Sequence, residues 1–463
     1  MLEFFTLVYK KPEDIIRYSE RRAIDTFRHA ARTVPAYREL LRQRGVDPAT
    51  IKGIADFKKQ VPVISKKETF LEHDSIQKLC VKGRLSDLKE ILASSGFSGA
   101  YSFGLSTKKD VLTSMAAIER VFEYIFDVRE KRSLLVNALA MGVKVPLRPE
   151  SPLAKIDTGP RVDTILAVIK NFTRCFEQII LIGANNLIKQ VIEEAPGEGI
   201  DLTRLNIRII LGGDFFPESL RSYLLSLLDR HLEGEKKMVI GSSLGVSEIG
   251  LNIFFETRET VLIRNKASHS PALARGLFGQ DAPFLPILFT YDPTRIYLEE
   301  EDGGLLVTAL GKERIMPLVR YRTGDRGKVL AYGECKEKLA RLGLGKYVPR
   351  EPFPFVLFCG RGAHVDMKGK ALYQETVREI LYRNKRIAAS LSGFFRLRKA
   401  AGVPVLELQL KKGKKALERA AGEYITRAVL KASGVRVRLR AYPYSLFPYG
   451  MEMDMTRKFE YVG

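Results

Sequence analysis

The chain has 463 residues, of which 76 are lysine or arginine and 54 are aspartate or glutamate, so its formal net charge is +22. Hydrophobic residues make up 45% of the chain, which excludes a mostly disordered protein, and the length favours two or more domains. The four cysteines are far apart and form no CxxC pair, which argues against a disulfide framework or a structural zinc site and is typical of the reducing cytoplasm.

The N-terminal part is predicted to be helical. Apolar residues recur at helical spacing over residues 13–44, with an interruption at Pro35, and again over 110–126. The first residues have no small-residue cleavage site, so we do not expect a signal peptide. No window holds 18 apolar residues without a charge, and we therefore expect no membrane span.

From about residue 134 the pattern changes to strands alternating with helices. We predict four strands, at 133–137, 178–182, 207–211 and 237–240, and three helices, at 162–171, 185–194 and 217–232. Between about 258 and 330, short predicted strands such as 260–264 and 304–308 indicate an antiparallel or barrel-like piece. The tail alternates again, with helices at 372–384 and 415–433 and strands at 405–410 and 435–439. The predicted fold class is therefore α/β and α+β: helix-flanked sheets with a barrel-like subdomain, followed by a small C-terminal α+β domain.

The positive charge is concentrated towards the C-terminus. Residues 327–463 hold 28 basic and 12 acidic side chains, a net charge of +16. Such a surface attracts nucleic acid, anionic lipid or a ligand with several phosphates, and the alternative is a solvated basic face. The region shows neither a zinc-finger pattern nor an RNA-recognition motif, so we do not expect nucleic acid as the partner.

A serine- and glycine-rich segment follows the predicted helices of the N-terminal part. It contains Ser94, Ser95, Gly96, Ser98 and Gly99. Small residues let the backbone approach an anion closely, and successive N–H groups with serine hydroxyls form an anion-binding nest. The GxxxxGK[ST] pattern of a Walker loop is absent, and a plain surface loop is the alternative.

Two further segments follow predicted strands. Gly213 and Asp214 come after the strand at 207–211, and Gly245, Ser247 and Glu248 come after the strand at 237–240. Ligands of open α/β sheets bind at the carboxyl ends of strands. The Glu248 carboxylate suits Mg²⁺ near phosphates, because magnesium prefers oxygen ligands. The alternatives are an ordinary strand-to-helix turn and a helix-capping acid.

The remaining segments lie in the C-terminal half. Asp325 ends the sequence YRTGD, and its two carboxylate oxygens suit the two hydroxyls of a ribose. Arg361 stands between Gly360 and Gly362, and Lys458 lies near the terminus. Taken singly, Asp325 could instead belong to an arginine–aspartate pair in a turn, and Lys458 could be an ordinary exposed lysine.

The order and spacing of these segments resemble the adenylate-forming superfamily, which contains acyl-CoA synthetases, luciferases and adenylation domains. The N-terminal sequences FRHAARTVPAYRE (27–39) and VPVISKKE (61–68) resemble the phenylacetate–CoA ligase branch. The resemblance covers nearly the whole chain. It implies an AMP-binding domain over 1–362 and a small mobile lid over 363–463.

The resemblance also implies an activity, namely that of an AMP-forming acid–thiol ligase. Such an enzyme uses ATP and Mg²⁺ to convert a carboxylic acid to an acyl-adenylate, and it then transfers the acyl group to coenzyme A. Alternatives within this hypothesis are transfer to a protein thiol, adenylylation of a deazaflavin cofactor, or a degenerate homologue that only binds nucleotide. Relatives often dimerise, so a homodimer is among the expectations, together with a cytoplasmic location.

Residue roles follow from the same resemblance. The segment with Ser94, Ser95, Gly96, Ser98 and Gly99 would hold the β- and γ-phosphates. Gly213 and Asp214 would contact the adenine and the acyl pocket, and the segment with Gly245, Ser247 and Glu248 would lie at the AMP phosphate and Mg²⁺. Asp325 would bind the ribose hydroxyls, and Arg361 would bind phosphate or ribose near the hinge between the domains. Lys458 would stabilise charge during adenylation.

Some positions depart from the family pattern or concern the second substrate. Phe97 stands where the family usually has threonine, and Leu244 stands where it usually has an aromatic residue; both motivate the degenerate alternative. Tyr101, Phe103, Met141 and Phe215 are the expected liners of the acyl pocket. The lysines of the segment 411–415 are expected to attract the phosphates of ATP and coenzyme A to the lid.

Overall fold

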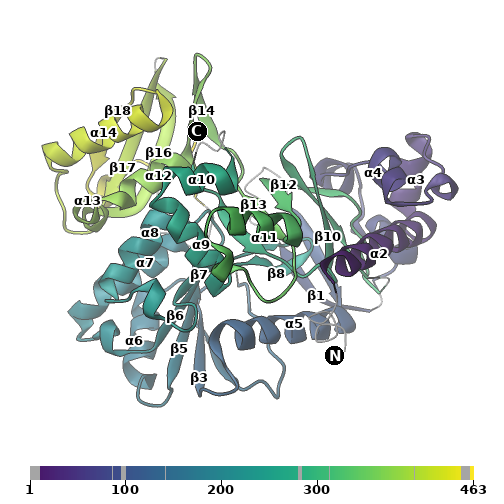
Figure 1. The fold of residues 1–463 in the computed structure, drawn as a ribbon, viewed down its shortest axis with the longest axis horizontal. Coiled ribbons are helices and arrows are strands. Elements are labelled where there is room, and N and C mark those ends of the chain that lie inside the picture. The colour runs from purple at the N-terminus through teal and green to yellow at the C-terminus, as the bar shows by residue number, and fades with distance from the viewer. Residues whose placement is uncertain are drawn as a thin grey trace.

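The computed structural model describes residues 11–85, 87–94, 101–140, 142–279, 284–311, 313–400, 402–449 and 459–463. Figure 1 shows a large part built around a sheet, with three N-terminal helices at one end and a small unit at the other. The N-terminal helices are α2 (Pro12–Thr33), α3 (Pro35–Gln43) and α4 (Ile54–Gln60). The predicted interruption at Pro35 is confirmed, because this proline begins α3.

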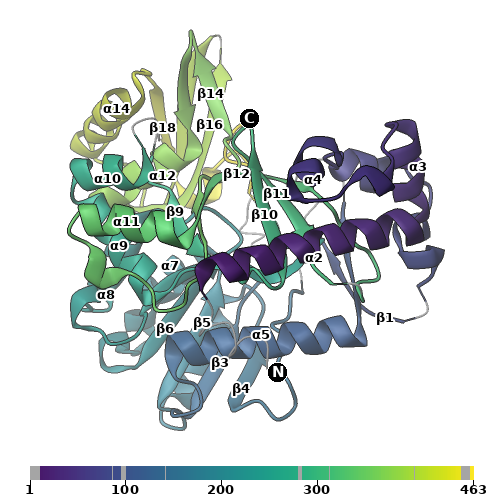
Figure 2. The ribbon, with the colours of Figure 1, turned by 45° about the vertical axis from the view of Figure 1, so that its right-hand side comes forward.

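Between these helices and the sheet lie a hairpin and a long helix. The hairpin is formed by β1 (Leu88–Ala93) and β2 (Phe103–Thr107), which pair antiparallel. The helix α5 (Lys108–Phe126) begins with a capping box in which Thr107 and Asp110 bond each other's backbone N–H groups. In Figure 2, α2 crosses in front of the sheet and α5 runs below it.

The centre of the described structure is one 11-stranded sheet with the order β10-β11-β12-β13-β9-β8-β7-β6-β5-β3-β4. Its strands are β3 (Ser133–Asn137), β4 (Leu153–Asp157), β5 (Gln178–Gly183), β6 (Ile207–Gly212), β7 (Ile240–Val246), β8 (Gly250–Phe255), β9 (Ile287–Thr290), β10 (Ile296–Glu301), β11 (Gly304–Ala309), β12 (Tyr321–Leu330) and β13 (Phe355–Phe358). Strands β3 to β7 are parallel and β8 to β13 are antiparallel. The predicted change from strands that alternate with helices to short antiparallel strands is confirmed, and both halves share this one sheet.

Both faces of the parallel half are covered by helices. Alternate residues of the strands point to opposite sides: Ile179 and Leu181 join the core beneath α6 (Val162–Phe172), α7 (Asn185–Glu194) and α8 (Glu218–Leu227), whereas Ile180 and Ile182 join the core beneath α5. A strand that is buried on both sides needs an apolar residue at nearly every position. This is why the residues at 178–182 form a nearly continuous apolar run and do not alternate between apolar and polar.

Three sequence-based predictions of local structure are corrected by the fold. The predicted strand at 260–264 is part of helix α9 (Arg258–Ser268), which is followed by α10 (Pro271–Phe278). The β-branched residues favour a strand locally, but the Thr257–Thr260 capping box and the hydrogen bonds of Arg264 to the Phe216 and Pro286 carbonyls stabilise a helix instead. The predicted helix at 217–232 ends at Leu227.

The third correction concerns the segment around Gly245. The strand predicted at 237–240 begins at Ile240 and runs on to Val246, so Gly245 lies within the strand and not in a turn after it. Ser243 and Leu244 pair with Phe255 and Phe254 of β8. The partner strand therefore extends β7 beyond what its own glycine and serine residues favour.

The small unit has its own apolar core. Its elements are β14 (His364–Met367), β15 (Lys370–Tyr373), α12 (Gln374–Arg383), α13 (Lys385–Ser390), β16 (Leu391–Ala400), β17 (Val403–Leu410), α14 (Arg419–Ser433) and β18 (Arg438–Tyr442). One hydrophobic cluster joins residues from Val365 to Tyr461 and lies over the three-stranded sheet β16-β17-β18. The predicted α+β tail is confirmed, although its last strand starts at Arg438.

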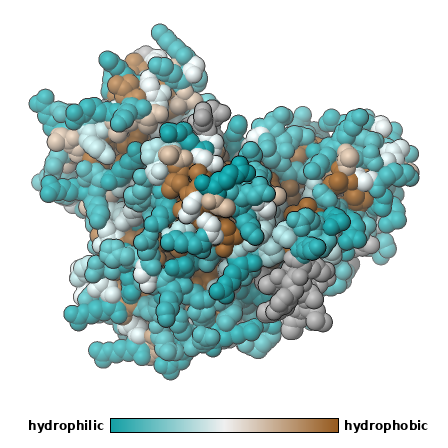
Figure 3. All heavy atoms as spheres, in the orientation of Figure 1, coloured by the Kyte–Doolittle hydropathy of each residue, from teal (hydrophilic) through white to brown (hydrophobic). Residues whose placement is uncertain are grey.

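A short helix, α11 (Tyr332–Arg341), lies in the connection between the neighbouring strands β12 and β13 of the large sheet. The face shown in Figure 3 is covered mainly by hydrophilic side chains, with hydrophobic residues in small groups. Within the described ranges, no helix is both long and apolar enough to cross a lipid bilayer.

Candidate active site

A cavity of about 340 Å³ lies at the carboxyl ends of β5, β6 and β7, where the small unit meets the large sheet. Residues predicted from separate segments line it together: Ser94, Gly213, Asp214, Gly245, Ser247, Glu248, Asp325 and Arg361. Ser95, Gly96, Phe97, Ser98, Gly99 and Lys458 lie outside the described residues. The small unit contributes Gln374, Glu375, Phe394, Phe459 and Tyr461 to the lining.

Glu248 is a buried carboxylate in the wall of this cavity, with 5% of its surface exposed. The Tyr321 hydroxyl donates a hydrogen bond of 2.7 Å to its Oε1, and the Ser247 hydroxyl donates one of 3.0 Å to its Oε2. Burial raises the pKa of Glu248, but the hydrogen bonds and the nearby Lys66 ammonium outweigh it, so the pKa lies below its usual range. Glu248 is therefore an ionised carboxylate in the lining of the cavity.

The hairpin β1–β2 packs closely against the Ser247 turn. Gly104 of β2 lies so near the Ser247 carbonyl that a Cβ atom there would collide with it. Beyond this contact the hairpin is closed by Ser94, whose N–H donates to the Ser102 carbonyl and whose hydroxyl accepts from the Ser102 N–H, both at 2.9 Å. Glycine at position 104 thus brings the strands on either side of the serine–glycine segment to the edge of the cavity.

Asp325 and Arg361 come from different segments and form an ion pair in the wall of the cavity. Arg361 Nε lies 3.5 Å from Asp325 Oδ1, and Asp325 is buried whereas the Arg361 side chain is 39% exposed. The Asp325 N–H donates to the Thr323 hydroxyl at 3.1 Å, which orders the turn within β12. Gly360 adopts a φ of +69°, a conformation that suits glycine, and directs the following arginine towards Asp325.

Lys66 is a cavity residue to which the sequence analysis assigned no role. Its Nζ lies 3.9 Å from Glu248 Oε1, and burial lowers the pKa of its ammonium while Glu248 counteracts this. A bridge between Ile64 and β12 positions it: the Ile64 N–H donates to the Arg320 carbonyl, and the Arg322 N–H donates to the Ile64 carbonyl. The only signal for Lys66 in the sequence is its place within the VPVISKKE segment.

Asp214 connects the end of β6 to the small unit. Gly213 adopts a φ of +88°, which turns the chain after the strand, and Asp214 then accepts a hydrogen bond of 2.8 Å from the Phe215 N–H. Its other oxygen is ion-paired with Arg378 of α12, which is itself buried and stacked on the Tyr461 ring at 3.8 Å from the centroid. Asp214 therefore lines the cavity but is already paired with a cation of the small unit.

Glu375 lies beside this pair and is fully buried. Its Oε1 accepts a hydrogen bond of 3.1 Å from the Gln374 amide, and among the described residues its Oε2 has no hydrogen-bond partner. Burial raises its pKa to about 7, the Asp214 carboxylate adds to this, and Arg378 opposes it. No sequence pattern indicates this group, because an acid at the start of a helix is not thereby marked as buried.

A second polar contact joins the two units away from the cavity. The Lys189 ammonium of α7, which is 1% exposed, lies 2.7 Å from Glu193 and donates to the Leu391 carbonyl of the small unit at 2.7 Å. Lys411 Nζ lies 2.9 Å from the other Glu193 oxygen. Lys411 is thus part of the contact between the units, whereas Lys412, Lys414 and Lys415 are exposed.

The expected liners of the acyl pocket are placed differently from one another. Phe215 and Leu244 line the cavity. Tyr101 is 64% exposed and Phe103 packs on Phe70, and neither belongs to the lining. Met141 lies outside the described residues.

Comparison with known proteins adds the following. No family model matches the sequence, and no curated protein matches it. Solved structures do match: 2-hydroxyisobutyryl-CoA ligase in the postadenylation state, in complex with R3-HIB-AMP, is similar over 97% of this chain and 89% of that chain, with a TM-score of 0.68 and 14% sequence identity. The GH3.15 acyl acid amido synthetase is similar over 93% of this chain and 87% of that one, with a TM-score of 0.55 and 12% identity.

The chain therefore has the fold of adenylate-forming CoA ligases and acid-amido synthetases, in which a large N-terminal domain is followed by a small C-terminal one. The same CoA ligase in its thioesterification state gives a TM-score of only 0.56 at the same coverage of this chain and 15% identity. The comparisons do not distinguish the phenylacetate–CoA ligase branch, which stays a prediction.

Proposed function

We propose that this protein is an AMP-forming ligase that activates a carboxylic acid as its acyl-adenylate and transfers the acyl group to coenzyme A. The observation that supports this most is the convergence of Glu248, Asp325, Arg361, Asp214 and Lys66 on one cavity at the carboxyl ends of the parallel strands. They come from separate parts of the chain, and the similar solved structures include a CoA ligase in complex with 2-HIB-AMP, which supports adenylation as the chemistry.

The proposed reaction has two steps. In the first, a carboxylate oxygen of the acid attacks the α-phosphorus of ATP, a new P–O bond forms, and the bond to the β-phosphate breaks, releasing pyrophosphate. In the second, the thiolate of coenzyme A attacks the acyl carbon, and AMP leaves with the electrons of the C–O bond. The protein contributes mainly orientation and charge, because both steps need aligned anionic groups.

The proposed roles of Asp325, Arg361 and Lys66 follow from their places in the cavity, whereas the roles of Lys458 and of the serine–glycine segment rest on the resemblance to the adenylate-forming superfamily. Asp325 accepts hydrogen bonds from the ribose hydroxyls, and Arg361 binds a phosphate oxygen or the ribose beside it. Lys66 and Lys458 neutralise charge on the phosphates, Lys66 from the large unit and Lys458 from the C-terminal end. The serine–glycine segment that begins at Ser94 supplies N–H and hydroxyl donors to the outer phosphates.

We further propose that Glu248 holds Mg²⁺ together with phosphate oxygens. An ionised, buried carboxylate fits this ion, which commonly takes one or two protein carboxylates and completes its shell with phosphates and water. Within the described part of the chain, no cluster of three histidine, cysteine or acidic groups is present to form a site from protein ligands alone. When bound, the ion would offset negative charge between the phosphates.

The test is a pyrophosphate-release assay with ATP, Mg²⁺ and a panel of aryl and alkyl acids, run with and without coenzyme A. We expect release that depends on the acid, and acyl-CoA as the product when coenzyme A is present. Release of pyrophosphate without acyl-CoA would point to a protein thiol or a deazaflavin cofactor as the acceptor. The proposal would be refuted if no acid caused pyrophosphate release and equilibrium dialysis detected no binding of ATP.

A further inference from the structure

The cavity has an apolar half that the nucleotide chemistry does not use. Ile118, Val121, Phe122 and Ile125 of α5 line it, and their spacing places all four on one face of that helix. Opposite them lie Ile182 at the end of β5 and Ile210 near the end of β6, together with Leu139, Val143, Val145, Met238, Leu251 and Phe255. Except for Phe122 and Phe255, all these side chains are aliphatic.

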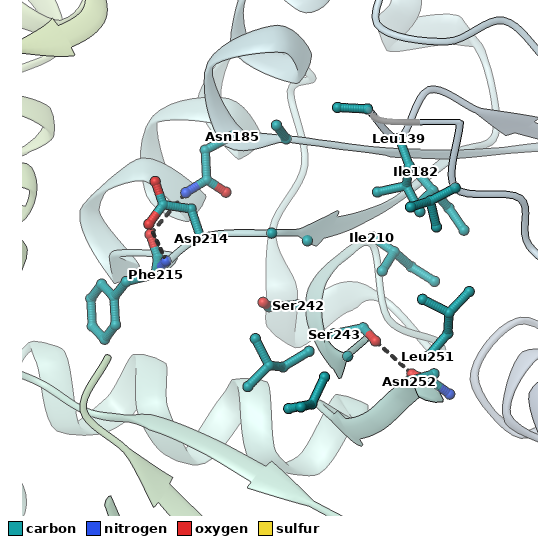
Figure 4. Close-up of a pocket in the computed structure, with 18 of the residues that line it drawn as sticks. Leu139, Ile182, Asn185, Ile210, Asp214, Phe215, Ser242, Ser243, Leu251 and Asn252 are labelled. Carbon is teal, nitrogen blue, oxygen red and sulfur yellow. Dashed lines mark hydrogen bonds between the residues drawn. The ribbon is translucent and has the colours of Figure 1, made fainter. Parts of the chain in front are cut away.

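Figure 4 shows how the two halves are separated. Asp214 and Asn185 lie on one side, and Leu139, Ile182, Ile210 and Leu251 gather on the other. The Ser243 hydroxyl between them donates to the Asn252 side-chain oxygen at 2.6 Å, so this polar pair satisfies itself within the wall.

Among the described residues that line the apolar half, no charged side chain is free to bind a polar tail. The one acidic liner near it is Glu256, which is fully buried and held by two hydrogen bonds from Arg221, at 2.7 and 2.8 Å, and one from the Ser242 N–H. The charged residues Lys66, Glu248 and Arg361 belong to the opposite half, around β12 and its neighbours. A ligand tail with a second charge would therefore be desolvated without a partner, which is costly.

The floor of this half is formed partly by Met238. Its thioether lies directly over Gly241, where a Cβ atom would collide with it. Methionine adapts to irregular apolar shapes, as do the leucine and isoleucine side chains around it. Such a wall suits a flexible hydrocarbon chain, whereas a flat ring would be better held by a slot of aromatic side chains.

We propose that the acid has an uncharged aliphatic tail of medium length, which occupies the space between α5 and the ends of β5 and β6. This inference rests on the proposed function for the reaction, but the binding of the tail depends only on the lining. Each methylene transferred to the lining should raise kcat/KM about fourfold, the equivalent of about 0.8 kcal/mol. The series should rise with chain length and level off when the cavity is filled.

The experiment measures acid-dependent ATP–pyrophosphate exchange for saturated acids of about two to twelve carbons, with benzoate and a dicarboxylate as comparisons. We expect octanoate to exceed acetate by at least 100-fold and the dicarboxylate of equal length by a similar factor. Val121→Phe should move the optimum to acids shorter by two or more carbons. Leu112→Phe is the matched control, because Leu112 is on the same helix but 46% exposed and outside the lining.

A second measurement separates this inference from the proposed function. Equilibrium dialysis with labelled octanoate, without ATP, should show binding that Val121→Phe weakens at least tenfold. If octanoate binds but no acid supports ATP–pyrophosphate exchange, the proposed reaction is refuted and the inference of an aliphatic tail is supported. If ATP–pyrophosphate exchange is faster with benzoate or acetate than with octanoate, the inference of an aliphatic tail is overturned, whereas the proposed reaction is supported. If phenylalanine at position 121 prevents folding, Val121→Thr, which keeps the shape and adds a hydroxyl, should lower octanoate binding several-fold.

Discussion

Glu375 provides a test of the contact between the two units that does not depend on the proposed reaction. It is fully buried between the small unit and the Gly360 turn, and burial raises its pKa from 4.5 to about 7. Asp214 also raises this pKa, whereas Arg378 and the Gln374 amide lower it. The folded protein therefore binds the proton of Glu375 more tightly than the unfolded chain does.

The size of the effect follows from these two pKa values. They differ by about 2.5 pH units, and each unit corresponds to ~1.36 kcal/mol, so ionising Glu375 in the folded protein costs about 3 kcal/mol. The protonated Glu375 carboxyl therefore makes its full contribution to the free energy of unfolding below a pH of about 4.5, and this contribution is lost as the pH rises through about 7. Glu375→Gln removes this loss, because the amide has the shape of the protonated acid and no charge.

We therefore expect Glu375→Gln to have nearly the same free energy of unfolding as the wild type at pH 5. At pH 8 it should be more stable by roughly 2–3 kcal/mol. Urea unfolding followed by circular dichroism between pH 5 and pH 8.5 measures this; the chain has no tryptophan to report on unfolding by fluorescence. The control is Glu423→Gln, which removes an exposed carboxylate of α14 that is paired with Arg419.

The reasoning would be refuted if the difference between Glu375→Gln and the wild type did not change with pH. A variant that is less stable than the wild type at pH 8 would likewise show that the ionised carboxylate has a stabilising partner. A change with pH of the same size in Glu423→Gln would assign the effect to net charge and not to burial.

Four further predictions concern the cavity and the contact between the units. Glu248→Gln should lower pyrophosphate release at least 100-fold with a melting temperature close to the wild type, and activity above a tenth of the wild type would contradict its role. Asp325→Asn should raise the KM for ATP about 10-fold or more, since the amide replaces one acceptor by a donor; an unchanged KM would remove Asp325 from the ribose site. Glu193→Ala should destabilise the fold by about 3–5 kcal/mol in urea, because it leaves the buried Lys189 without a counter-ion, whereas the double variant Lys189→Met/Glu193→Leu should cost clearly less. Replacing the three exposed lysines of the segment 411–415 by serine should raise the KM for coenzyme A at low salt only, and equal kinetics at low salt would make them a solvated face.

The sequence was sufficient to predict the architecture where local patterns and tertiary packing agree. The unbroken apolar run of β5 predicted a strand, and Gly213, which follows β6, predicted the turn that places Asp214 at the strand end. The resemblance to the adenylate-forming superfamily rested on the order of such segments along the chain. The described members of that motif set do line one cavity.

Only the tertiary structure decided which remote residues share an environment. The β-branched residues of α9 form a helix, because capping and the hydrogen bonds of Arg264 to remote carbonyls outweigh their local preference for a strand. Lys66 faces Glu248 only because the segment at Ile64 bridges to β12. The pKa of Glu375 near 7 comes from burial beneath another unit, and burial depends on contacts made by residues far apart in the chain, which no local sequence pattern contains.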